Sequence, residues 1–199
     1  MTQTQPAAAA TRVVDGAELP APGRWQIDPG HAEVAFIGRH FLLTKVRGRF
    51  TGVAGAITVA EDPAESTAEV TIDTASVDSG SQVRDDHLRS ADFFDAARHP
   101  TATFTGGATG WRGTRGQLTG SLTIRGITRP VTLAVDYLGH VADPWGGQRA
   151  IFTAAGTLNR EDWGLTWNMP LDNGGLLVSR EIRIEIEAEA VLQSAAPRA

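Results

Sequence analysis

A strict alternation of apolar and polar residues near the C-terminus constrains the fold of this chain most. In the stretch EIRIEIEAEAVL, residues 181–192, every even-numbered position is Ile, Ala or Leu, and every odd-numbered position but one is Glu or Arg. Successive side chains of a β-strand point to opposite faces, so this pattern predicts a long strand with one buried face and one wet face.

The same alternation recurs along most of the chain. It involves Val34 and Phe36; Val46 and Phe50; Val70 and Ile72; Ala102 and Phe104; Leu118, Leu122 and Ile124; Val131, Leu133 and Val135; and Ala150, Phe152, Ala154 and Leu158. Turn residues separate these runs at Asp28-Pro29-Gly30, Gly106-Gly107, Arg125-Gly126, Asp143-Pro144 and Gly146-Gly147. The spacings are too short for helical crossovers, so the pairing is predicted to be mostly antiparallel.

An all-β fold of about eight strands, each with one apolar face, has two economical forms, a two-sheet sandwich and a closed barrel. Long strands favour the barrel because closure removes exposed edges. Several inward positions hold small residues, namely Gly120, Ala150, Ala154, Gly156, Ala188 and Ala190. Periodicity alone leaves open whether these residues fit a solid, tapering barrel or leave a channel.

Composition limits the partners of such a barrel. With 199 residues and 41% hydrophobic side chains, the chain is expected to form one domain. Its net charge of -5 comes from interspersed acids and bases, with no basic stripe, so nucleic acid is not an expected partner. The chain has no cysteine, which excludes disulfides, thiolate metal sites and a cysteine nucleophile.

The two ends of the chain differ from its centre. Residues 6–23 are rich in Ala, Pro and Gly, and residues 1–24 are expected to form a flexible arm. Residues 194–199 are expected to form a short tail. The start shows no signal-peptide pattern, and no apolar run reaches the length of about 20 residues that spans a membrane. We therefore expect a cytoplasmic protein without stable membrane insertion.

The stretch RDDHLRSADFFDAARHP, residues 84–100, interrupts the alternation. Ser79-x-x-Gln82 has the form of a capping box and predicts a helix from Gly80 to about Leu88, within a helical insertion at about residues 80–95. The structural interpretation is a lid, in which Phe93 and Phe94 close one end of the barrel.

The alternative for this stretch is catalysis. Asp85 and His87 have side chains that can bind a metal, joined by His31 or His40 in a mixed site. Asp-x-His is a pattern of low information without a partner at a constrained spacing. A serine triad is disfavoured because the chain has no Gly-x-Ser-x-Gly motif.

Several motifs together resemble those of the YceI-like family, whose full name refers to lipid or polyisoprenoid binding. They are WQIDPGHAEVAFIGRH, VRGRF, RDDHLRSADFFD, LTIRGITRPVTL, LNREDWGLTWN and GGLLVSREIRIEIEAEAVL. The resemblance implies a lipocalin-like, eight-stranded antiparallel barrel domain over residues 25–193, with a pore that holds an amphiphilic isoprenoid.

The chain departs from the family pattern in three places. Ala32 replaces a small hydroxyl residue, Trp163 replaces Phe before Gly164, and Ser179-Arg180 replaces a turn of Gly and an acid. The first departure puts a head-group hydrogen bond at this position in doubt, and the second predicts a narrower pore.

The resulting hypothesis is a non-enzymatic barrel that binds, sequesters or transports a polyisoprenoid or similar lipid, with no cofactor and no metal; a homodimer is among the expected assemblies. The expected pore lining is Phe36, Phe50, Phe93, Phe94, Phe104, Leu122, Leu133, Phe152, Trp163, Trp167, Ile184 and Ile186. The expected head-group residues are His31, His40, Arg84, Asp85 and His87. Two alternatives stay open, a metal-dependent enzyme acting on a small lipid-like substrate and a filled barrel without a ligand.

Overall fold

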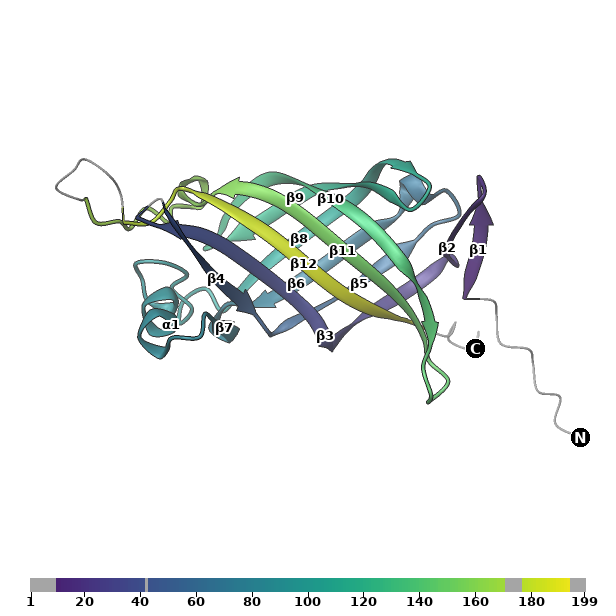
Figure 1. The fold of residues 1–199 in the computed structure, drawn as a ribbon, viewed down its shortest axis with the longest axis horizontal. Helices are drawn as coiled ribbons and strands as arrows, with labels where there is room; N and C mark the ends of the chain where they lie inside the picture. Colours follow the sequence, from purple (N-terminus) through teal and green to yellow (C-terminus); the bar gives the residue numbers. More distant parts are fainter. Residues whose placement is uncertain (1–9, 42, 171–176, 194–199) are drawn as a thin grey trace, which may run out of the picture.

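The computed structural model describes residues 10–41, 43–170 and 177–193, and within them the chain is almost entirely β-structure (Figure 1). The strands are β1 (Thr11–Val14), β2 (Ala17–Pro20), β3 (Gly23–His40), β4 (Thr44–Phe50), β5 (Val53–Val59), β6 (Thr67–Asp73), β7 (Val77–Asp78), β8 (Thr101–Arg112), β9 (Arg115–Ile124), β10 (Ile127–Ala142), β11 (Gln148–Asn159) and β12 (Glu181–Leu192). One α-helix, α1 (Gln82–Arg89), and three short 3-10 helices, Pro63–Glu65, Thr74–Ser76 and Arg160–Trp163, complete the described elements.

The large sheet closes into an eight-stranded antiparallel barrel, which confirms the predicted fold class. Its order is β12-β11-β10-β9-β8-β6-β5-β3, and β12 closes the ring by pairing with β3. β4 and β5 together act as one interrupted strand: β4 pairs with the second half of β3, and β5 pairs with its start. The pairing of β12 with β3 removes the two edges that an open sheet would have there.

The face assignment of β12 agrees with the alternation. Ile184 and Ile186 pack against the core cluster inside the barrel, whereas Glu185 bonds Arg47 on the outside at 2.5 Å. On the neighbouring strand β3, Phe36 lies opposite Ile184 and Val34 lies opposite Ile186. The long strand therefore presents its apolar face to the interior.

Two predicted turns are wrong. Asp28-Pro29-Gly30 lies within β3, where residues 28–31 form a bulge: Ile27 pairs with Ala190 and Ala32 with Ala188, so four residues face one. The Asx turn is present, since the Gly30 amide donates to Asp28 Oδ1 at 3.0 Å, but it bends the strand and does not end it. Gly106-Gly107 also lies inside a strand, β8.

The predicted flexible arm over residues 1–24 is not found in its described part. Residues 11–20 form the hairpin β1–β2, whose turn residues Asp15 and Gly16 both have positive φ, 49° and 79°. Two positive-φ turn residues are typical of a type I′ hairpin. Leu19 of this hairpin is 3% exposed and packs with Trp25 against one barrel end, to the right in Figure 1. Residues 1–9 and 194–199 lie outside the described residues.

The helical insertion lies at the opposite barrel end, to the left in Figure 1, which we call the lid end. The predicted capping box does not form: Ser81 caps α1 without a side-chain bond. Ser79 instead donates its backbone N–H (2.8 Å) and its hydroxyl to Asp85 Oδ1. Asp85, 6% exposed, therefore fixes the segment before the helix. Among the described residues, no helix combines the length and the apolar character that crossing a membrane requires.

Candidate ligand-binding cavity

An apolar cavity of about 530 Å³ occupies the barrel interior. All but one of the predicted pore residues line it, drawn from most strands of the barrel and from the helical insertion. The exception is Trp163, which is 2% exposed and lies in the wall, where its indole N–H donates to the Leu122 carbonyl at 3.0 Å. The narrowing predicted from Trp163 is therefore wrong, because its ring lies outside the cavity lining.

The cavity exists because large inward side chains do not fill the barrel. Ile184, Ile186 and Phe152 point inward yet are only half-buried, so part of their apolar surface faces open space inside the barrel. Ala154 and Ala188 line this space as well. An apolar cavity of this size lies within the range of about 300–1,000 Å³ typical of small-molecule sites.

Not every small residue contributes room. The ring of Phe104 covers two glycines on neighbouring strands, since an added Cβ would lie 2.6 Å from its Cζ at Gly106 and 2.8 Å at Gly120. Phe36 covers Gly48 in the same way, with a distance of 2.3 Å to an added Cβ. Each of these glycines lies under an aromatic ring, and such glycine–aromatic pairs stabilise glycine positions in sheets. The interior is thus partly filled and partly hollow.

The helical insertion closes the lid end with residues of two kinds. Phe93 is 7% exposed and packs in a core cluster with Trp163 and Leu165. Phe94 is half-buried and packs edge-on against Phe50, with ring centroids 5.1 Å apart. Phe93 is therefore part of the barrel core, whereas Phe94 covers the end of the cavity.

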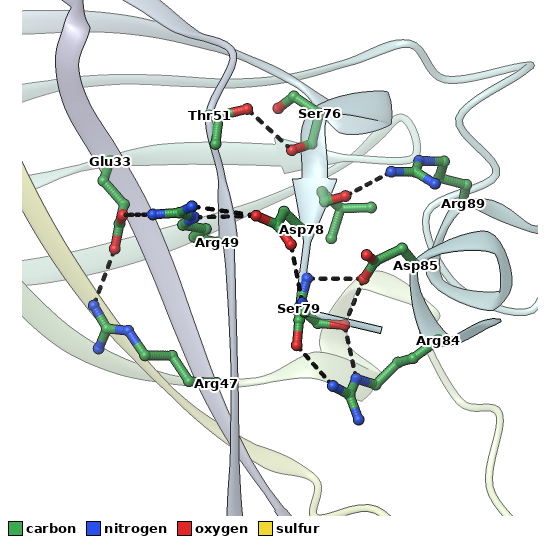
Figure 2. A network of polar contacts seen from close by, with 12 residues as sticks. Glu33, Arg47, Arg49, Thr51, Ser76, Asp78, Ser79, Arg84, Asp85 and Arg89 are labelled. Atoms are coloured by element: carbon green, nitrogen blue, oxygen red, sulfur yellow. Dashed lines mark hydrogen bonds and ion pairs between the residues drawn. The ribbon is translucent and has the colours of Figure 1, made fainter. Parts of the chain in front are cut away.

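Polar contacts tie this insertion to the barrel (Figure 2). Arg49 of β4 bonds Asp78 at 3.2 Å and Glu33 at 3.1 Å on the outer wall. Arg89 of α1 donates to the carbonyls of Ala75 (2.8 Å) and Val77 (2.7 Å). Arg49 thus ties the segment before α1 to the barrel, and Arg89 ties α1 to that segment.

The predicted head-group residues do not form one group. His40, Arg84 and His87 line the cavity at the lid end. Arg84 donates to the hydroxyl and the carbonyl of Ser79, both at 2.7 Å, as Figure 2 shows. Asp85 accepts hydrogen bonds from Ser79, and His31 lies on the bulge of β3. Neither residue lines the cavity. The binding of a head group by His40, Arg84 or His87 stays a prediction.

The structure does not assemble the metal site considered from the sequence. His87 bonds Asp92 at 2.9 Å and stacks edge-on against Trp167. Within the described ranges, the one group of three metal-binding side chains close to one another is Asp28, His31 and Glu189. The Arg149 guanidinium already bonds Asp28 at 2.6 Å and Glu189 at 3.0 Å, so this group is held together by a protein cation.

This ion cluster makes a pH-dependent contribution to stability. Hydrogen bonds from Arg149 and His31 lower the pKa of Asp28 from 3.8 to about 2. A lowered carboxyl pKa stabilises the fold above the unfolded value, and this contribution is lost as the pH falls from about 4 toward 2. Arg149→Gln is expected to lower the free energy of unfolding at pH 7 and to lower it less near pH 2.

Urea unfolding of both proteins at pH 7, 4 and 2.5 measures this effect. Arg115→Gln is the matched control, because Arg115 pairs with Asp136 at 2.7 Å but is 82% exposed. A loss of stability in Arg149→Gln that stays constant over this pH range would contradict the assigned role of Asp28.

Sequence reasoning missed Arg160, which lies in the motif LNREDWGLTWN and lines the cavity although it is 5% exposed. No periodicity signals it, because Arg160 begins a 3-10 helix after β11. Arg39, at the lid end, and Arg12, on the N-terminal hairpin, also line the cavity and were not predicted.

Comparisons with known proteins agree with this architecture. A family model described as YceI-like domain matches residues 25–190. Protein YceI of Escherichia coli O157:H7 is 40% identical over 164 residues, which cover 82% of this chain and 83% of that protein.

Two solved structures share the fold. A YCEI protein of Campylobacter jejuni is 30% identical with a TM-score of 0.67, and the match covers 78% of this chain and 90% of that one. A polyisoprenoid binding domain from Saccharophagus degradans is 17% identical with a TM-score of 0.62, over 85% of this chain and 98% of that one. With the family model matched over the barrel and 40% identity over most of both sequences, this chain belongs to the YceI-like domain family.

Proposed function

We propose that this protein binds an amphiphilic isoprenoid lipid in the barrel cavity and sequesters or carries it without catalysing a reaction. The observation that carries the proposal is the set of inward apolar side chains, such as Ile184, Ile186 and Phe152, that remain partly exposed to a cavity of about 530 Å³. An apolar molecule that covers this surface removes it from water, which is favourable.

The distribution of polar groups supports an amphiphile. The barrel wall supplies mostly apolar side chains to the cavity, whereas Arg84 and His87 line it at the lid end and Arg12 lines it at the opposite end. A ligand with an apolar chain along the wall and a polar head at an end of the cavity matches this distribution. Burying the chain is favourable by up to roughly 0.8 kcal/mol per methylene before ordering costs are subtracted.

The structural neighbour from Saccharophagus degradans is described as a polyisoprenoid binding domain, which supports the same class of ligand here. The enzyme alternative finds less support. Its proposed set of Asp85, His87, His31 and His40 is not brought together, because Asp85 binds Ser79 and His31 binds Asp28. The filled-barrel alternative is disfavoured by the volume of the cavity.

Mass spectrometry of the purified protein tests this proposal. Native spectra are expected to show a bound amphiphile at about one per chain, and organic extraction should recover a prenyl lipid. Protein refolded from denaturant without lipid should show no adduct and should regain one when a prenyl lipid is added. Protein that is isolated empty and takes up no added prenyl lipid would refute the proposed function.

A further inference from the structure

Arg160 is one of the residues that line the cavity, and its guanidinium lies buried beside the Phe93 ring. It begins the short helix Arg160–Trp163 after β11, and its side chain is held in place by two backbone carbonyls. Nε donates to Ser179 O at 2.9 Å, and Nη1 donates to Leu165 O. The guanidinium carbon also lies 5.9 Å from the centre of the Phe93 ring.

The remaining nitrogen of this guanidinium is Nη2. Nη2 of Arg160 is buried and makes no hydrogen bond within the described part of the chain. The adjacent carboxylate, Glu161, bonds Arg180 at 3.1 Å, and among the described residues Arg160 forms no ion pair. A buried cation without a counter-ion is costly, because desolvation is not repaid by an opposite charge.

This cost affects the pKa of Arg160. Burial lowers the pKa of its guanidinium below the ordinary value. Other arginines at the cavity differ from Arg160: Arg84 and Arg39 are exposed, and Arg12 pairs with Glu61 at 2.8 Å. Arg160 is thus the buried, uncompensated cation of the lining within the described residues.

We propose that Arg160 is the head-group site of the cavity and that it binds an oxyanion, the carboxylate or phosphate of an amphiphile. This inference rests on the proposed function and specifies the class of ligand. The unpartnered Nη2 can donate to an anionic oxygen, and a charge-assisted bond in apolar surroundings is roughly twice as strong as a neutral one. The planar guanidinium, already fixed by two carbonyls, is preorganised to accept it.

The test compares three ligands with one chain and different heads: farnesol, farnesoic acid and farnesyl monophosphate. Their dissociation constants are measured by titration below their aggregation concentrations at pH 7.5, where the acid and the phosphate are ionised. The wild type is expected to bind at least one oxyanion ligand about tenfold or more tightly than the alcohol, an effect of one charge-assisted bond. Comparison of the acid with the phosphate shows which oxyanion the site takes.

Substitutions assign this preference to Arg160. Arg160→Gln should lose the preference and bind farnesol within about twofold of the wild type, because the chain still occupies the cavity. Arg180→Gln is the matched control, since Arg180 is 63% exposed and pairs with the neighbouring Glu161, and it should keep the preference.

A salt series covers the case in which Arg160→Gln fails to fold. Buried pairs are screened little, so a preference that depends on Arg160 should persist from low salt to about 1 M, whereas one that depends on exposed Arg84 should vanish. Equal binding of alcohol and oxyanions, a preference abolished by salt, or one retained in folded Arg160→Gln would overturn the inference and leave the proposed function standing. If none of the three ligands binds, the proposed function itself fails.

Discussion

Ile184→Glu is expected to lower the free energy of unfolding by about 3 kcal/mol or more. Ile184 lies on β12, pairs with Phe36 of β3 across the closure of the barrel, and packs against the core cluster that includes Phe50. A carboxylate at this position would face apolar side chains, Phe36 across the strand pair and the core cluster around Phe50. It must either be buried charged or take up a proton, and both cost stability.

Glu187→Leu is the matched control on the same strand. Glu187 is exposed on the outer face, opposite Glu33 of β3, so its replacement is expected to change stability by no more than about 0.5 kcal/mol. Ile184→Ala separates loss of packing from burial of charge. Chemical denaturation of the four proteins gives the comparison, and equal losses in Ile184→Glu and Glu187→Leu would contradict the face assignment of β12.

Affinity for prenyl lipids is expected to rise steeply with chain length and then to level off. Each added isoprene unit that enters the cavity removes five carbons from water, worth up to about 4 kcal/mol before ordering costs are subtracted. A net gain of about tenfold per unit corresponds to 1.4 kcal/mol, well below this limit. Because the cavity has a finite volume of about 530 Å³, units beyond its capacity stay in water and add little.

The barrel could be predicted because its signal is periodic. Alternation over residues 181–192 assigned the faces of β12, and the same rule placed Val34, Leu133 and Phe152 inside. Closure brings these faces together whatever the exact register, so the list of lining residues depends little on details of pairing. Trp163 was expected in the lining without support from alternation, and it lies on a 3-10 helix with its indole bonded to the wall.

Local signals were harder to interpret because tertiary context overrides them. Asp28-Pro29-Gly30 has the chemistry of a turn, yet pairing on both sides holds it as a bulge within β3. Asp15-Gly16 is a sequence typical of a two-residue hairpin turn. The Ala-rich segment before it favoured the interpretation as an arm, although residues 11–14 form β1. Gly106-Gly107 has the composition of a turn, but Gly106 lies under the ring of Phe104 on the same strand.

The polar residues of the site could not be predicted from the sequence because their roles depend on their neighbours. Asp85 was considered as a metal ligand and instead bonds Ser79, while Arg160 was not singled out from the sequence and is buried. The first outcome follows from a local contact six residues apart, and the second from the contact of Arg160 with the carbonyl of Ser179, which lies on a later segment.

The most direct test of the central claim, that the cavity holds a lipid chain, is a chain-length titration repeated on a shortened cavity. Ala154 lines the cavity from β11, and Ala155 is its neighbour on the opposite face of the same strand. Ala154→Phe should lower the plateau affinity and move the plateau to a shorter prenyl chain, whereas Ala155→Phe should leave the wild-type curve in place. A length-independent wild-type series, or a plateau that is the same in folded Ala154→Phe and in Ala155→Phe, would contradict the claim.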